Sequence, residues 1–183
     1  MLRVFDILFS GIGLILCAPI FIVVILLGLL ESGSPFFIQE RVGVQKKLFK
    51  LIKFRTMKLD TDSVATHLVS PAAVTRLGFF LRKNKIDELP QLWNVLKGDM
   101  SLVGPRPCLP NQLELIMERS KRAVFKVRPG ITGLAQIEGV DMSTPERLAT
   151  IDADMLNSLN TYNYFKYIFK TLLGYGRGDS ICL

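Results

Sequence analysis

The sequence predicts a mainly helical α+β fold in which an N-terminal membrane hairpin of two helices is joined to a small globular domain. Three observations predict it: a long uncharged apolar run, two short strand-like segments joined by a turn, and a later series of amphipathic helical segments. A chain of 183 residues suits one compact domain with a membrane element. We therefore divide it into a membrane-embedded part, residues 1–34, and a globular part, residues 35–183.

The apolar run extends from Ile7 to Leu30 without a charged residue. This exceeds the roughly 20 residues that a helix needs to cross a bilayer. Pro19 lies midway, where it removes a backbone hydrogen bond and should bend the helix. Basic residues flank both ends, with Arg3 before the run and Arg41 after it, and such flanks tend to stay in the cytoplasm. A helix-break-helix hairpin that enters and leaves on one face is favoured over a single transmembrane anchor, which stays open.

Two segments after the apolar run are typical of short strands, Phe36–Ile38 and Phe49–Met57, and Gly43–Lys47 forms a turn between them. They predict a β-hairpin. Leu59–Pro71 is polar and predicts a loop, and Ile131–Ile137 is strand-like.

The rest of the globular part is predicted to be helical. Asp87 is a good N-cap for one helix, and Gly98 is a good terminator of the same helix. The last helix carries aromatic residues suited to a membrane interface. The expected helices are Val74–Lys83, Asp87–Lys97, Leu109–Val127, Thr144–Leu159 and Tyr162–Leu173.

Composition narrows the possible chemistry. The chain is 49% hydrophobic with a net charge of +7, which suggests an anionic membrane surface, phosphates or nucleic acid as partner. Nucleic acid is disfavoured because aromatic residues are not interleaved with the basic ones. The single histidine, His67, excludes Ser-His-Asp and multi-histidine metal sites. The catalytic chemistry that remains is that of carboxylates with arginines nearby in the sequence.

The adjacent pair Asp87-Glu88 has two readings. Near Lys83, Lys85 and a helix N-terminus, an ionised carboxylate is a competent nucleophile toward phosphorus, especially with Mg²⁺ held by carboxylates and substrate phosphates. Alternatively, Asp87 only caps a helix and Glu88 is only an acidic residue in the first turn of that helix. The spacing of the residues alone favours this structural interpretation. The DxD patterns at 60–62 and 152–154 also match metal-nucleotide sites, but that motif is short and frequent.

Three strings are specific to one family: Lys53-Phe54-Arg55-Thr56-Met57; Arg82, Asp87-Glu88-Leu89-Pro90-Gln91 and Asn94 through Pro107; and Arg128-Pro129-Gly130-Ile131-Thr132-Gly133-Leu134-Ala135-Gln136. With these strings the chain resembles the bacterial sugar transferase family, the small monotopic phosphoglycosyl transferases. The likeness runs in order from Arg3 to about Asp154.

The resemblance implies a reaction. Asp87 would attack the β-phosphate of a UDP-sugar, release UMP and pass the phosphosugar to a polyprenol phosphate such as undecaprenyl phosphate, with Mg²⁺ bound at Asp87 and with Glu88 assisting. Ala18-Pro19 matches the break of the family's re-entrant membrane helix. The substrate-binding candidates are Lys53, Arg55, Arg82, Arg106, Arg128 and Gln136.

The resemblance also implies a setting: the bacterial inner membrane, with the catalytic domain on its cytoplasmic face, and initiation of a polysaccharide such as capsule, O-antigen or lipopolysaccharide. Membrane lipids are then partners, and apolar helices leave room for a homo-oligomer. Two alternatives stay open. One is a non-catalytic membrane scaffold of a polysaccharide assembly complex, and the other is a DxD glycosyltransferase that releases UDP.

Overall fold

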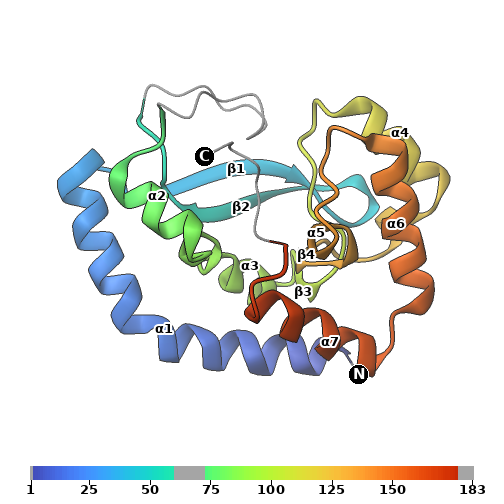
Figure 1. The fold of residues 1–183 in the computed structure, drawn as a ribbon, viewed down its shortest axis with the longest axis horizontal. Coiled ribbons are helices and arrows are strands. Elements are labelled where there is room, and N and C mark those ends of the chain that lie inside the picture. The colour runs from blue at the N-terminus through green and yellow to red at the C-terminus, as the bar shows by residue number, and fades with distance from the viewer. Residues whose placement is uncertain (1, 60–72, 177–183) are drawn as a thin grey trace.

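The computed structural model describes residues 2–59 and 73–176 as a mainly helical α+β fold (Figure 1). The predicted polar loop, with His67 and the first DxD pattern, falls largely outside the described residues. The helices are α1 (Leu2–Ser32), α2 (Arg76–Lys83), α3 (Gln91–Lys97), α4 (Leu113–Lys121), α5 (Leu134–Ile137), α6 (Pro145–Ser158) and α7 (Thr161–Leu172). The strands are β1 (Phe36–Val42), β2 (Leu48–Phe54), β3 (Ser101–Val103) and β4 (Gly130–Thr132), with 3₁₀ turns at Val44–Lys46, Ile86–Glu88 and Val124–Lys126.

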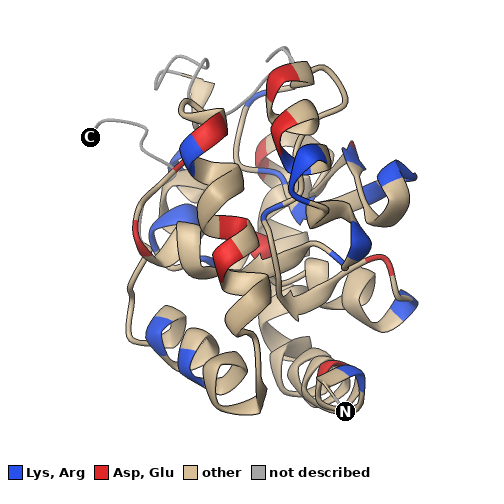
Figure 2. Ribbon diagram, turned by 90° about the vertical axis from the view of Figure 1, so that its right-hand side faces the viewer, with Lys and Arg blue, Asp and Glu red and all other residues tan. Residues whose placement is uncertain are grey.

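Helix α1 is one continuous helix with Pro19 inside it, so the expected division into two helices is not confirmed. It bends sharply near its middle (Figure 1), as a helix does where proline removes a backbone hydrogen bond. Its most apolar 18-residue window has a mean hydropathy of 3.0, and 11% of that window is buried. By length and composition, this helix is able to cross a membrane. Figure 2 looks along the first part of α1, where charge appears only near the N-terminus.

Both halves of α1 contact the globular part, which lies inside the bend (Figure 1). At the N-terminal end, Arg3 donates to the carbonyls of Leu96 and Met100 at 3.2 and 3.3 Å. In the other half, Val24 packs with Phe54 and Leu81 in one buried cluster. Contacts at both ends therefore fix α1 to a single body.

The predicted β-hairpin is confirmed. β1 and β2 are antiparallel, with Phe36 opposite Phe54 and Val42 opposite Leu48. Gly43 N donates to Lys47 O at 2.9 Å and closes the turn. The first strand is longer than expected and the second ends earlier, at Phe54.

The strand expected at Ile131–Ile137 is largely wrong. Only Gly130–Thr132 forms a strand, and α5 begins at Leu134 after Gly133, which is extended but lies outside the strand. β4 pairs in parallel with β3, which the sequence did not indicate. A three-residue parallel pair depends on a partner distant in the chain, so local periodicity does not reveal it.

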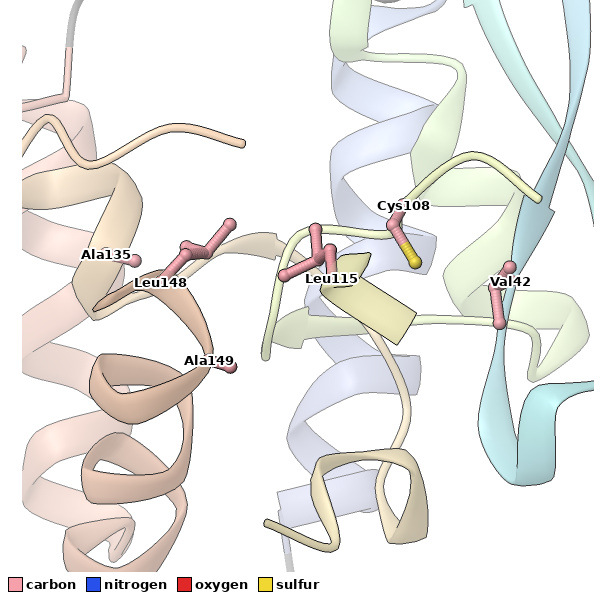
Figure 3. Close-up of a cluster of buried hydrophobic side chains, with 6 residues drawn as sticks. All are labelled: Val42, Cys108, Leu115, Ala135, Leu148 and Ala149. Carbon is pink, nitrogen blue, oxygen red and sulfur yellow. The ribbon is translucent and has the colours of Figure 1, made fainter. Parts of the chain in front are cut away.

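The predicted long helix Leu109–Val127 is also shorter in the structure. α4 ends at Lys121, and Ala123 has a positive φ of 57° that separates it from the next 3₁₀ turn. The last two helices match their predicted ranges to within one or two residues. Figure 3 shows a buried cluster that crosses from Val42 of β1 to helices α4, α5 and α6: Val42, Cys108, Leu115, Ala135, Leu148 and Ala149.

Candidate active site

Asp87 and Glu88 lie in the 3₁₀ turn that precedes α3. Lys85, with a left-handed φ of 56°, starts this turn, and Asp87 is buried, with 9% of its surface exposed. The N-cap of α3 is Pro90, which makes no side-chain capping bond. The prediction that Asp87 caps this helix is therefore wrong. The chain turns once more before the helix begins, and that turn separates the carboxylate from the helix start.

Glu88 is the centre of a small ion-pair cluster. Its Oε1 atom lies 3.1 Å from Lys53 Nζ of β2 and 3.3 Å from Arg106 Nη2 of the segment after β3. The three side chains are 16 to 26% exposed, so solvent reaches the cluster only partly. Tertiary folding thus brings two of the predicted phosphate-binding residues, Lys53 and Arg106, to Glu88.

Arg82 approaches from the last turn of α2. Its Nε donates to Thr56 Oγ1 at 2.8 Å, while its Nη1 is buried and has no hydrogen-bond partner among the described residues. Gly78 permits the close approach of α2, because a Cβ there would lie 2.1 Å from Thr56 O. A buried guanidinium nitrogen without an acceptor fits an incoming phosphate oxygen.

Arg55 contacts the main chain at the junction of α1 and β1. It donates to Ser34 O at 3.1 Å and to Phe36 O at 3.2 Å, and its guanidinium lies 5.7 Å from the ring of Phe37. In this structure Arg55 connects the segment after α1 to the hairpin.

Arg128 and Gln136 also bind main-chain carbonyls. Arg128 Nε donates to Gly98 O at 2.8 Å, beyond the end of α3, and Gln136 Nε2 donates to Ile131 O at 2.8 Å. The Oε1 of Gln136 is buried without a hydrogen-bond partner among the described residues. The bond from Arg128 joins the third family string, residues 128–136, to the end of α3. The bond from Gln136 is made within that string.

The second DxD pattern does not form a metal-nucleotide site. Asp152 is 1% exposed and bound to Arg119, whereas Asp154 is exposed. Burial raises the pKa of Asp152, and the Arg119 charge opposes that rise. The sequence analysis had disfavoured a metal-nucleotide site at this DxD pattern because the motif is short and frequent.

Asp87 is the candidate ligand for a magnesium ion shared with a substrate. Among residues 2–59 and 73–176, no group of three or more His, Cys, Asp or Glu side chains is placed to hold a metal. Magnesium commonly takes one or two carboxylates and completes its shell with substrate phosphates and water. One carboxylate, that of Asp87, would be enough for this mode of binding, since the Glu88 carboxylate is already paired with Lys53 and Arg106.

Comparison with known proteins decides the family. A model described as bacterial sugar transferase matches residues 1–177. The chain belongs to the bacterial sugar transferase family. As a family member, and by the names of its relatives, it is an enzyme of the sugar-phosphate transferase class.

Three relatives of this sugar transferase show the range of lengths in the family. An uncharacterized sugar transferase, EpsL, of Bacillus subtilis is 46% identical over 93% of this chain and 84% of its own. The exopolysaccharide production protein ExoY of Rhizobium meliloti is 36% identical over 93% and 83%. An undecaprenyl-phosphate galactose phosphotransferase of Salmonella typhimurium is 34% identical, over 92% of this chain but only 39% of its own.

Sequence reasoning missed several residues that contact the candidate site residues of this sugar transferase or lie behind them. Thr56 lies inside the first family string but was not assigned a role. Arg119 has a recognisable signal, because it follows Leu115 by one helical repeat and thus lies on the buried face of α4. A basic residue on such a face requires a partner, and only the fold identifies it as Asp152.

Proposed function

We propose that this chain transfers a phosphosugar from a UDP-sugar to a polyprenol phosphate, through a covalent intermediate on Asp87. One observation carries the proposal: Glu88, next to Asp87, holds Lys53 and Arg106 at 3.1 and 3.3 Å. Two cations beside two adjacent carboxylates form a site for a diphosphate that must approach an anionic nucleophile.

The names of relatives support the two substrates. Relatives include an undecaprenyl-phosphate galactose phosphotransferase, an undecaprenyl-phosphate glucose phosphotransferase and a UDP-galactose-lipid carrier transferase. We extend the polyprenol phosphate acceptor and the UDP-sugar donor to this chain.

The first half-reaction forms a bond between a carboxylate oxygen of Asp87 and the β-phosphorus of the donor. The bond from that phosphorus to the oxygen shared with the α-phosphorus breaks, and UMP leaves with this oxygen. We assign the phosphate oxygens to the guanidinium of Arg106 and to Nη1 of Arg82, which has no hydrogen-bond partner among the described residues. Fixed donors of this kind stabilise the developing charge.

The second half-reaction forms a bond between an oxygen of the polyprenol phosphate and the same phosphorus. The acyl-phosphate bond breaks, which restores the Asp87 carboxylate and gives a polyprenyl diphosphate sugar. Glu88 takes the remaining proton of the acceptor phosphate, which makes it a better nucleophile. Asp87 would hold Mg²⁺, which neutralises charge on the donor diphosphate.

The same proposal places α1 in the cytoplasmic leaflet of the inner membrane as a re-entrant helix. Both of its ends contact one globular body, through Arg3 at one end and Val24 toward the other. A helix that crossed the bilayer would separate these ends by roughly 30 Å of hydrocarbon. The bend at Pro19 lets both ends stay on the side of the catalytic part.

The test is UMP release by purified full-length protein with undecaprenyl phosphate, Mg²⁺ and a panel of UDP-sugars. Asp87→Asn should release no UMP, while Asp154→Asn, an exposed site, should match the wild type. Without acceptor, intact-mass measurement should show one added phosphosugar on the wild type and none on Asp87→Asn. Chelation by EDTA should stop release and added Mg²⁺ should restore it. Full activity of Asp87→Asn contradicts the covalent route.

The same assay separates the two alternatives. A DxD glycosyltransferase would release UDP instead of UMP. A scaffold would release neither nucleotide from any donor, while it still bound other proteins of the assembly.

A further inference from the structure

The segment that carries Arg106, residues 104–112, is held in place by hydrogen bonds to its main-chain carbonyls. It connects β3 to α4, and Pro105 and Pro107 on either side of Arg106 restrict its backbone further. Four consecutive carbonyls each accept a hydrogen bond: Pro105 O from Gly130 N at 2.9 Å, Arg106 O from Arg119 Nη1 at 2.8 Å, Pro107 O from Arg41 Nη1 at 3.1 Å and Cys108 O from Val42 N at 2.9 Å. Two of the four donors are arginine side chains.

Arg119 reaches this segment from the interior. It lies on α4 and is 1% exposed, and its partner Asp152 on α6 is also 1% exposed. Asp152 Oδ2 lies 2.9 Å from Nε and 2.7 Å from Nη2 of Arg119, so the remaining nitrogen, Nη1, is directed to the Arg106 carbonyl. On the same two helices, Leu115 of α4 and Leu148 of α6 belong to one apolar cluster with Cys108 (Figure 3).

Stability alone is a weak reason for such a pair. Removing two charges from water costs several kcal/mol per ion, and well-packed apolar residues often replace a buried ion pair without loss of stability. What apolar residues do not supply is a donor for the Arg106 carbonyl. The planar guanidinium can bind a carboxylate on one side and a carbonyl on the other, which a lysine ammonium does not reproduce with the same geometry.

We propose that Arg119 and Asp152 form a positioning pair for Arg106. Asp152 orients the guanidinium of Arg119, Arg119 fixes the Arg106 carbonyl, and the side chain of Arg106 is thereby placed 3.3 Å from Glu88 and toward the donor diphosphate. Neither residue touches substrate. The inference rests on the proposed function, since it assigns Arg106 to the transferred phosphate.

The sharpest variant replaces the pair by apolar residues, Arg119→Met with Asp152→Leu. We expect an unfolding temperature equal to or above that of the wild type, and a kcat for UMP release that is about 10- to 100-fold lower, because small displacements of a charge-stabilising group are costly to rate. The conservative variant Asp152→Asn should fold and lose a smaller part of kcat. Unchanged kcat in the apolar variant overturns the proposal, and if that variant does not fold, unchanged kcat in Asp152→Asn overturns it.

A double-mutant cycle with Arg106→Lys provides a readout that a purely structural role would not change. Asp152→Asn should lower kcat in the wild-type background and have little further effect beside Arg106→Lys, whereas its shift in unfolding temperature should be the same in both. Equal loss of kcat in both backgrounds contradicts positioning through Arg106. If the wild type releases no UMP from any donor, the proposed function fails. If it does and the cycle shows no coupling, only this inference fails.

Discussion

The hydroxyl of Tyr164 donates a hydrogen bond of 2.8 Å to Oδ1 of Asp6, which joins α7 to the first turns of α1. The same oxygen accepts from Ser101 Oγ and from Leu102 N, both at 2.9 Å, at the start of β3. Asp6 is 3% exposed and Tyr164 is fully buried. One carboxylate thus links the N-terminal helix, the parallel strand pair and the last helix.

Tyr164→Phe should lower the free energy of unfolding by about 1.5 to 3 kcal/mol, the usual range for a hydrogen bond to a charged group. Thermal unfolding in detergent measures it. Tyr162→Phe is the matched control, because Tyr162 is on the same helix but 73% exposed. Equal unfolding temperatures for the two variants would contradict a stabilising role for this bond.

The pH dependence of that difference has a definite sign. Burial raises the pKa of Tyr164 above the ordinary tyrosine value of about 10, and the hydrogen bond to Asp6 and the charge of Asp6 raise this pKa further. Since the folded pKa is the higher one, the stabilisation is fully present below pH 10 and declines as the unfolded chain ionises above it. The stability gap between wild type and Tyr164→Phe should therefore be constant from pH 7 to about 9 and shrink above pH 10. A gap that widens there would be evidence against the assignment.

Glu88→Gln should reduce kcat for UMP release by about 100-fold, within the range for loss of one acid-base group. The variant keeps the shape of the side chain but loses the charge that holds Lys53 and Arg106. Steady-state UMP release measures the effect. Glu114→Gln, at an exposed position of α4, should behave as the wild type. Wild-type turnover in Glu88→Gln would remove Glu88 from the site.

Arg82→Lys should raise KM for the UDP-sugar by about tenfold or more, since a charge-assisted hydrogen bond to phosphate is lost. The reason is the buried Nη1, for which no protein acceptor is present among the described residues. Arg76→Lys is the control, because Arg76 lies on the same helix but is exposed. A donor KM that is the same in both variants would show that Nη1 does not meet the donor.

Membrane topology can be tested by cysteine labelling. In a background without the natural cysteines, Leu2→Cys and Glu40→Cys should both react from the cytoplasmic side alone, because both ends of α1 contact one globular body. A membrane-impermeant maleimide on spheroplasts and on inverted vesicles distinguishes the two sides. Labelling of Leu2→Cys from the periplasmic side would restore the single transmembrane anchor.

Elements with a strong local signal were predicted from the sequence. The hairpin β1–β2 follows from a compact turn between two apolar segments, and α6 and α7 follow from helical periodicity. Two errors had different origins. β3 and β4 stabilise each other in parallel from distant parts of the chain, and propensity within a short window does not contain that contact. The start of α3 was misplaced because a local turn with a left-handed residue, Lys85, delays the helix beyond Asp87.

The sequence by itself determined the family, the acidic pair and the apolar helix with its proline, because these depend on residue type and order along the chain. Only the tertiary structure decided which cations meet Glu88 and that Asp152 binds Arg119 inside the protein. The physical reason is that these relationships join segments far apart in the chain. Packing of β2, the segment after β3 and the interior of α4 and α6 places them within hydrogen-bond distance.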